Sequence, residues 1–353
     1  MKTREYGVDL LKSVSMFMVV ILHILGTGGV LTAAEHGSAA YAAAWLLETA
    51  CICAVNCFGL VSGYVLSKGR YKRSRLLSLW LRVVLESLVI TALFAALLRG
   101  SLGPDAWLMA VTPVIHGVYW YFTAYFALFF FIPYINKLLT ALTKRETAGL
   151  ALSVVLVFVF LGNITGLDLY QLHGGYGFLW LLCLYTLGGC LRNMAPERKA
   201  GKFWYLAAYG LSVLLAWAGT LLFNTQALIS YTSPFTLLSA VLLLLFFSRL
   251  ALRAPSLQKC IAMLARTSFG VYIIHTHPLI WTHILTGRFV PFLKLPVPLA
   301  IAAILLTACG IYAVCTLGDW LSEKFFQLIR TDLLENAADS LGKRRKPQNT
   351  VRK

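Results

Sequence analysis

Long apolar stretches separated by short polar segments recur along almost the whole chain. A helix needs about 20 consecutive, predominantly apolar residues to cross the hydrocarbon core of a bilayer. The stretches that meet this criterion are residues 7–27, 42–67, 76–98, 119–141, 147–164, 176–193, 203–223, 234–251, 267–286 and 297–322. The pattern therefore predicts an all-α fold, a polytopic helical membrane protein with ten transmembrane helices in a single domain, residues 1–330.

Lysine and arginine residues are concentrated in every second predicted loop, after the second, fourth, sixth and eighth spans. They are Lys68, Arg70, Lys72, Arg73 and Arg75; Lys137, Lys144 and Arg145; Arg192, Arg198, Lys199 and Lys202; and Arg249, Arg253, Lys259 and Arg266. The intervening loops contain only Arg99, Arg288 and Lys294. Because short cytoplasmic loops are enriched in basic residues, this alternation predicts that both termini are cytoplasmic. Residues 331–353, polar and basic, are predicted to be a disordered cytoplasmic tail attracted to anionic lipid.

The amino-acid composition also indicates a membrane protein, and it argues against a soluble enzyme and against a nucleic-acid-binding protein. The chain has 353 residues, 59% of them hydrophobic, which is too apolar for a soluble enzyme. The net charge of +17 comes mostly from loops and tail, so it indicates membrane orientation and no nucleic-acid partner. The eight cysteines lack metal-site spacing, so we expect small buried apolar side chains and no metal. The first apolar run resembles a secretory signal, but its internal charges and the later spans favour a retained helix.

Three ionisable side chains, Asp9, Lys12 and His23, interrupt the first predicted span. Each costs roughly 2.5 to 3.5 kcal/mol inside a membrane, so a functional interpretation is the default. Ten residues separate Lys12 from His23, about three helical turns, which predicts one shared face and a separation of about 16 Å along the axis. Asp9, three residues before Lys12, would orient or neutralise it. The alternative is that Lys12 snorkels to the interface and His23 packs against another helix.

Two further groups offer chemistry near the predicted cytoplasmic side. The basic run from Lys68 to Arg75 is a candidate for binding phosphate groups. The alternative is that these residues only fix the orientation of the chain in the membrane. Arg82 and Glu86 are four residues apart on one helical face and predict an intramembrane ion pair facing the bundle, with structural pairing alone as the alternative.

Aromatic and imidazole side chains mark two other regions. Trp120 and Tyr121 begin the fourth span and are candidates for substrate contact or for interfacial anchoring. His275 and His277 lie in the predicted ninth span just before Pro278. Because two residues two positions apart on a helix point in different directions, we expect one of these histidines to act rather than a joint metal site.

These features together resemble the membrane-bound acyltransferase 3 family, especially bacterial polysaccharide O-acetyltransferases. The similarity is carried by the cation and histidine ten residues apart (Lys12, His23), Phe58–Tyr64 with its Phe-x-x-x-Ser-Gly-Tyr pattern, the basic run Arg73–Leu77, Tyr119–Tyr125 with Pro133 and Asn136 beyond, Tyr185–Gly189 and Ser268–His275. Many relatives have arginine where this chain has Lys12, and a lysine cannot grip two oxygens in the planar geometry of arginine.

The resemblance implies a ten-helix core that takes acyl groups from cytoplasmic acyl-CoA, in particular acetyl-CoA, and delivers them to a hydroxyl. It implies a multi-pass protein of the bacterial plasma membrane whose acceptor is a cell-envelope glycan or lipid-linked saccharide. The resulting candidates are His23, Lys12 and Asp9 for catalysis; Arg73, Arg75, Lys72, Ser62 and Arg82 for the donor; and Trp120, Tyr121, Glu86, His275 and His277 for the acceptor.

Two questions stay open at this level. His23 would either deprotonate the acceptor hydroxyl or receive the acyl group before passing it on. The alternative function is a transporter, a flippase or a substrate-sensing membrane module without acyl chemistry. A transporter is expected to contain two half-chain repeats with matching broken helices, and the prolines of this chain do not pair off by halves.

Overall fold

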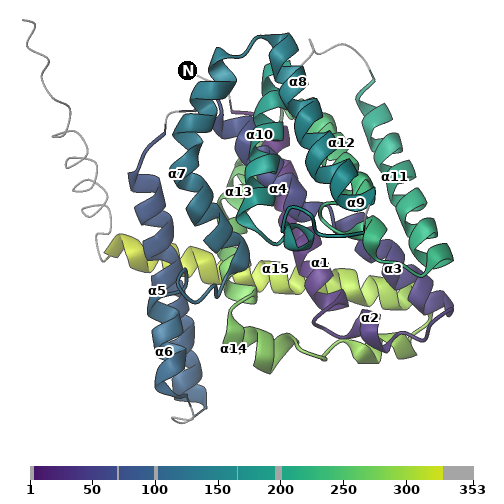
Figure 1. Cartoon of the computed structure of the whole chain (residues 1–353). Helices are drawn as coiled ribbons and strands as arrows, with labels where there is room; N and C mark the ends of the chain where they lie inside the picture. The colour runs from purple at the N-terminus through teal and green to yellow at the C-terminus, as the bar shows by residue number, and fades with distance from the viewer. Residues whose placement is uncertain (1–3, 70, 99–101, 165, 195–200, 329–353) are drawn as a thin grey trace, which may run out of the picture.

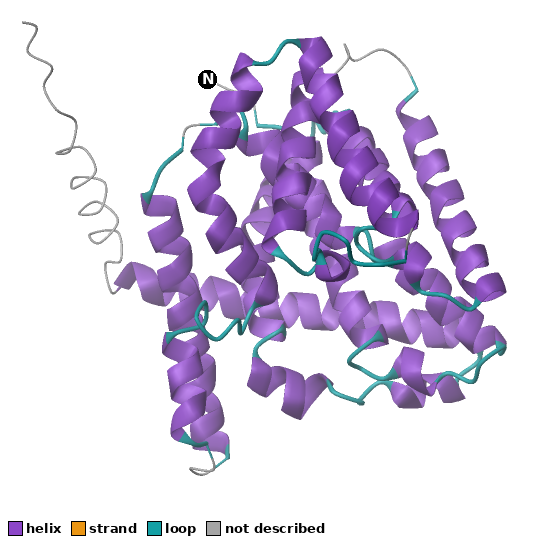
Figure 2. Cartoon of the chain, viewed as in Figure 1, coloured by secondary structure: helices purple, strands orange, loops and turns teal. Residues whose placement is uncertain are grey.

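The computed structural model describes residues 4–69, 71–98, 102–164, 166–194 and 201–328, which form helices and connecting loops without a strand (Figure 2). The α-helices are α1 (Tyr6–Leu25), α2 (Val30–Ala33), α3 (Ala39–Cys51), α4 (Ala54–Leu66), α5 (Ser74–Leu97), α6 (Pro104–Val111), α7 (Trp120–Ala141), α8 (Lys144–Val154), α9 (Gly162–Ile164), α10 (Phe178–Met194), α11 (Lys202–Phe223), α12 (Pro234–Ser248), α13 (Pro255–His275), α14 (Pro278–Ile280) and α15 (Val297–Leu328). Short 3-10 or π segments are η1 (Val155–Leu161), η2 (His173–Gly175), η3 (Ala227–Ile229), η4 (Trp281–Leu285) and η5 (Val290–Lys294). The predicted all-α class is confirmed for this part of the chain, and the predicted tail at 331–353 lies outside it.

Eight helical elements within the described ranges are long and apolar enough to cross a membrane. They are Tyr6–Ala33, Ala39–Leu66, Ser74–Leu97, Trp120–Ala141, Lys144–Ile164, Lys202–Phe223, Ala227–Ser248 and Val297–Lys324. Helix α10 is apolar but shorter, and its ends lie within two residues of the predicted span 176–193. The protein is therefore a multi-pass membrane protein, while the count of ten spans stays a prediction.

Two predicted spans have different boundaries in the structure. Residues 42–67 form two helices, α3 and α4, interrupted at Ile52 and Cys53. The span predicted at 267–286 is wrong in its bounds, because α13 begins at Pro255 and ends at His275. The imidazole Nδ1 of His277 accepts a hydrogen bond of 3.2 Å from the Leu279 N–H and caps α14, which Pro278 begins. The two histidines therefore lie at a helix junction and not in mid-helix.

Helix α1 runs through the middle of the protein and joins its two main apolar cores (Figure 1). Its first half, with Val8 and Leu11, packs into a core formed with α4, α7, α10 and α12. Its second half, from Met16 to Leu25, packs into a core formed with α13 and α15. Any polar side chain on α1 consequently faces protein on most sides, so its partners must come from these neighbouring helices.

Small residues bring α4 and α10 into close backbone contact. A Cβ atom added at Gly63 would collide with the Tyr185 carbonyl oxygen, and one added at Gly188 would collide with the Leu60 carbonyl oxygen. Glycine at both positions is therefore required by packing, as close helix approach in membranes commonly is. The two glycine-containing segments of the sequence meet face to face and hold α4 in place along the cavity described below.

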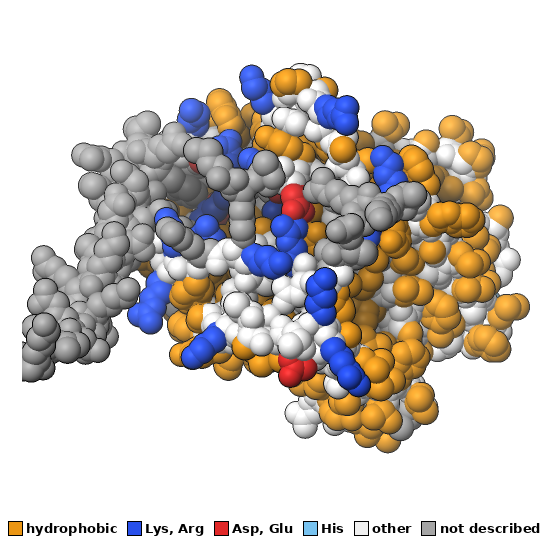
Figure 3. All heavy atoms as spheres, turned by 90° about the horizontal axis from the view of Figure 1, so that it is seen from above, with side chains coloured by type: hydrophobic (Ala, Val, Ile, Leu, Met, Phe, Trp, Pro, Cys, Tyr) orange, Lys and Arg blue, Asp and Glu red, His pale blue; other side chains and the backbone are white. Residues whose placement is uncertain are grey.

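Lysine and arginine side chains gather on one face of the protein, seen from above in Figure 3. The connection between α7 and α8 lies at this end in Figure 1. Apolar side chains dominate the flanks visible in the same view. This distribution matches what the positive-inside rule requires of a cytoplasmic face.

We predict that cysteine labelling will assign the basic face to the cytoplasm. The background needs replacement of Cys260 and Cys309 alone, because the other six cysteines are buried. A cysteine at Lys72, an exposed loop position, should react only after the membrane is permeabilised, whereas one at His36, also exposed, should react in intact cells. Labelling of the Lys72 position from outside would reverse the assignment.

Candidate functional site

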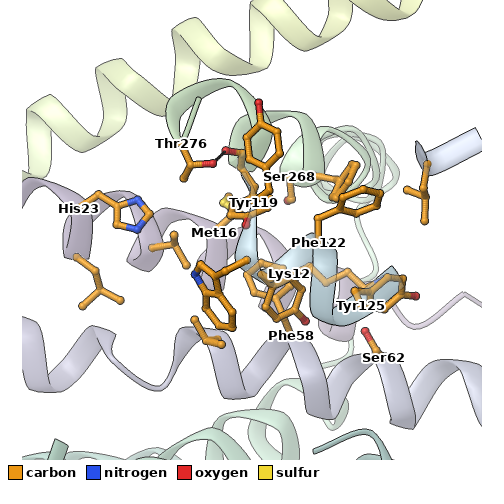
Figure 4. Close-up of a pocket in the computed structure, with 18 of the residues that line it drawn as sticks. Lys12, Met16, His23, Phe58, Ser62, Tyr119, Phe122, Tyr125, Ser268 and Thr276 are labelled. Carbon is orange, nitrogen blue, oxygen red and sulfur yellow. Dashed lines mark hydrogen bonds between the residues drawn. The ribbon is translucent and has the colours of Figure 1, made fainter. Parts of the chain in front are cut away.

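A cavity of about 640 Å³ lies between α1, α4, α7, α13 and the segment after α13. Its walls are mainly apolar and aromatic. It is lined by Lys12, Met16, Val19, Leu22, His23, Val55, Phe58, Val61, Ser62, Val65, Leu66, Leu79, Val118, Tyr119, Trp120, Tyr121, Phe122, Tyr125, Tyr231, Ala265, Ser268, Phe269, Tyr272, Thr276, Pro278, Trp281 and Thr282. Figure 4 shows His23 at one end and Ser62 and Tyr125 toward the other.

Helix α1 contributes the lysine and the histidine of this lining, Lys12 and His23. Met16, Val19 and Leu22 line the cavity between them, at the spacing of one helical stripe. The 3.6-residue period thus places the ammonium and the imidazole on the same wall, as the sequence pattern predicts. Because the stripe between them is apolar, the two polar groups lie at separate ends of an otherwise hydrophobic wall.

His23 is held from behind by a second histidine that does not line the cavity. Its Nδ1 lies 2.9 Å from Nε2 of His275, and Nδ1 of His275 lies 2.5 Å from the Val271 carbonyl oxygen. A carbonyl oxygen only accepts, so His275 Nδ1 carries the proton, and in the neutral ring Nε2 accepts from His23 Nδ1. In this hydrogen-bond chain, Nε2 of a neutral His23 is therefore unprotonated. Its lone pair is available to accept a proton, as a general base requires.

Aromatic rings surround the path to His23. The ring of Trp281 packs with its centroid 4.6 Å from that of His23, at an interplanar angle of 70°. Trp120 and Tyr121 both line the cavity, and Trp120 stacks on Tyr231 with centroids 6.1 Å apart. These side chains therefore form an internal wall, which is a different placement from an interfacial anchor.

Lys12 is paired at the opposite end of the stripe. Its Nζ lies 3.0 Å from Oδ1 of Asp9, and Nε of Arg4 lies 2.5 Å from Oδ2 of the same carboxylate. Asp9 thus accepts from two cations, and only 30% of the Lys12 side chain is exposed. The sequence predicted the Asp9–Lys12 pair, whereas the contribution of Arg4 was missed because the residue precedes the helix.

Four of the five predicted donor residues occupy two places. Ser62 lines the cavity, whereas Lys72, Arg73 and Arg75 are exposed at the start of α5 and do not. Leu79, one helical turn after Arg75 on α5, does line the cavity. The basic segment therefore lies beside the cavity and does not form its wall.

Arg82 belongs to a buried ionic cluster outside the cavity lining. Its Nε lies 3.0 Å from Oε1 of Glu86, and its Nη2 contacts Oδ1 of Asp319 on α15. Both carboxylates are 1% exposed, and one oxygen of each, Glu86 Oε2 and Asp319 Oδ2, has no hydrogen-bond partner among the described residues. The cluster joins α5 to α15, so Arg82 and Glu86 are committed to an interhelical ion pair and not placed to contact a ligand in this cavity.

Gly270 of α13 makes this arrangement possible. A Cβ atom added there would collide with the Asp319 carboxylate. Nearby, His277 is 3% exposed and its Nε2 lies 3.2 Å from the Ser87 hydroxyl. His277 therefore has both ring nitrogens engaged, one by Ser87 and one by the cap of α14, and it lies outside the cavity lining.

Several site residues had weak signals in the sequence or none. Asp319 was visible as an acid in an apolar span, but its pairing with Arg82 bridges 237 positions. Trp281 and Tyr231 carry no motif, and only the fold brings them to the cavity. Glu48 of α3 is a further acid within an apolar helix, and its Oε2 is buried without a hydrogen-bond partner in the described chain.

Comparison with known proteins gives one match. A family model described as an acyltransferase domain, of the acyltransferase 3 type, matches residues 5–316. No curated protein and no solved structure matches the chain. The matched region begins just before α1 and ends within α15, so it contains every residue that lines the cavity, together with Arg82 and Glu86, and it ends three residues before Asp319.

We predict opposite effects for alanine at two helical glycines. Gly270→Ala should lower the thermal stability of the detergent-solubilised protein, because the new methyl group displaces Asp319 and disturbs a buried ion pair, a loss on the order of 3 kcal/mol. Gly310→Ala on α15 is the control, since nothing lies within 4 Å of its added Cβ and alanine favours a helix by about 1 kcal/mol. Equal melting temperatures for the two variants would show that the cluster contributes nothing to stability.

Proposed function

Because the chain belongs to the acyltransferase 3 family of membrane acyltransferases, we propose that it is an acyl-CoA-dependent O-acyltransferase of a bacterial cell membrane. In this proposal it transfers an acetyl group from cytoplasmic acetyl-CoA to a hydroxyl group of a cell-envelope glycan or lipid-linked saccharide. The observation that carries the proposal is the polarised His23, which faces a large cavity together with Lys12.

His23 acts as the general base in the proposed reaction. Nε2 takes the proton of the acceptor hydroxyl while the hydroxyl oxygen attacks the thioester carbonyl carbon. The carbon–sulfur bond then breaks, the acyl group stays on the oxygen, and the proton passes from His23 to the departing thiolate. His275 supports this step because its hydrogen bond fixes the tautomer of His23 and stabilises the imidazolium that forms. The alternative is an acyl-histidine intermediate: Nε2 attacks the thioester carbon and the thiolate leaves, then the acceptor hydroxyl attacks the same carbon, the carbon–nitrogen bond breaks, and the hydroxyl proton is taken up by the thiolate.

Lys12 and the basic segment act on the donor. In the proposal Arg73, Arg75 and Lys72 hold the donor phosphates at the cytoplasmic face, where phosphate contacts with arginine are charge-assisted. The thiol-bearing arm then passes Ser62 and Lys12 along the apolar stripe of α1 to reach His23. The exposure of the basic segment and the position of Leu79, one turn after Arg75, in the cavity lining support this placement.

The aromatic wall suits a carbohydrate acceptor. Trp120 and Tyr121 line the cavity, and rings of this kind present flat apolar faces and polar edges to a ligand. Glu86, His275 and His277, which the family resemblance also suggests for the acceptor, are buried behind the lining and already hydrogen-bonded or ion-paired. We therefore assign acceptor contact to Trp120 and Tyr121, and assign positioning or structural roles to the other three.

Incubation of the purified protein with radiolabelled acetyl-CoA and envelope glycan fractions tests the proposal directly. Label should appear in a glycan fraction only when protein and donor are both present. Label that stays on the donor, with movement of unmodified saccharide between the faces of a vesicle, would instead support a flippase.

We predict that His23→Gln will be almost inactive while still binding acyl-CoA. Glutamine keeps a hydrogen-bonding side chain but cannot exchange protons, so turnover should fall by about 10²- to 10⁴-fold. His275→Gln should lose activity less and should change the pH profile of the remaining rate, because the base is still present but no longer oriented. Near-normal transfer by His23→Gln would remove His23 from the mechanism.

We predict that Lys12→Arg will retain activity and that Lys12→Ala will not. Alanine removes the cation, so KM for acyl-CoA should rise by about tenfold to a hundredfold, the loss of one charge-assisted contact. Folding should survive because Asp9 keeps its ion pair with Arg4. Steady-state kinetics on protein whose melting temperature has been verified separates weaker donor binding from a loss of folded protein. An unchanged KM for acyl-CoA in Lys12→Ala would exclude Lys12 from donor binding.

A further inference from the structure

A second cavity of about 480 Å³ lies where four helix termini meet, away from the site described above. The ends of α4, α7 and α10 and the start of α8 form it. It is lined by Ser67, Lys68, Leu139, Thr140, Leu142, Lys144, Thr147 and Asn193. This lining shares no residue with the first cavity, and it contains two lysines and no acid.

Two buried hydroxyl groups in this lining lack hydrogen-bond partners. Thr147 is fully buried and Ser67 is 8% exposed, yet neither Thr147 Oγ1 nor Ser67 Oγ has a partner among the described residues. A buried hydroxyl without a partner costs free energy, so such a group requires an explanation. Both residues line the cavity, and a ligand that accepts hydrogen bonds would satisfy them.

Positive charge surrounds these hydroxyls. Lys144 is the first residue of α8, where the free N–H groups and the helix dipole favour an anion and disfavour a cation. The carboxylate of Glu146 does not line the cavity, and it accepts hydrogen bonds from the Thr143 N–H (2.8 Å) and the Thr143 hydroxyl (2.7 Å) within the capping box. A lysine in this unfavourable position becomes favourable once an anion is present.

We propose that this cavity binds the phosphate group of a phosphate ester. Two buried hydroxyl donors, the ammonium group of Lys144 and a helix N-terminus suit a ligand with negative charge and several acceptor oxygens, which a phosphate provides. The phosphate belongs either to the nucleotide end of coenzyme A or to the headgroup of an anionic lipid. The site is inferred from its own residues and does not depend on the proposed acyl transfer.

Binding measurements on the full-length protein in nanodiscs test the proposal without a turnover assay. The variants are Thr147→Val, which removes the hydroxyl at nearly constant volume, and Lys144→Gln. Lys137→Gln is the matched control, because Lys137 is an exposed lysine at the end of α7 that lines neither cavity. One arm titrates coenzyme A and dephospho-coenzyme A in phosphatidylcholine nanodiscs, and the other measures the rise in melting temperature caused by phosphatidylglycerol.

The two arms distinguish the sources of the phosphate. Both variants should lose about tenfold in affinity for coenzyme A, or should lose the stabilisation by phosphatidylglycerol, while Lys137→Gln keeps both. In phosphatidylcholine alone Thr147→Val should melt no lower than the original protein, because the removed hydroxyl had no partner to lose. Unchanged responses to both ligands, or a destabilised Thr147→Val protein, would overturn the proposal.

Discussion

An ionisable side chain inside a bilayer has to find its partner within the protein, and this constraint accounts for most of the polar architecture of the chain. Asp9 pairs with Lys12 and Arg4, Arg82 pairs with Glu86 and Asp319, and His23 bonds to His275. The pairs of Arg82 and His23 join segments more than 200 positions apart. They therefore fix how α1, α5, α13 and α15 lie relative to one another.

These pairings also distinguish polar groups that are fully engaged within the protein from polar groups that are free to contact a substrate. Arg82 is engaged by two carboxylates and lies behind the cavity lining, so its charge serves helix assembly. His23 is engaged at Nδ1 only, and its bond to His275 improves the other nitrogen as a base. Lys12 shares its carboxylate with Arg4, which leaves the ammonium less completely neutralised than in an isolated pair. In the proposed reaction, the chemistry therefore takes place on the part of α1 where pairing is incomplete.

Local patterns in the sequence predicted the helices and one wall of the site, because both depend on periods that a single segment contains. The apolar runs gave the ends of α1, α5, α7 and α11 within two residues, and the helical period placed Lys12 and His23 together. The same reasoning predicted a wrong end for α13. The length of an apolar run does not show that His277 caps the next helix, α14, and so the chain leaves α13 at His275. It also left the roles of His275 and Asp319 unresolved, because each is defined by a partner far away in the chain.

The shape of the cavity constrains how donor and acceptor meet in the proposed reaction. Lys12 and His23 are separated by about 16 Å along α1, with apolar side chains between them. A donor held by its phosphates at the basic face must therefore extend a long, weakly polar arm along this stripe to present its thioester to His23. The surrounding aromatic and aliphatic side chains limit the water that reaches the thioester, which favours transfer to an alcohol over hydrolysis. The acceptor has to approach from the His23 end, beside Trp281, so the two substrates reach the base from opposite directions.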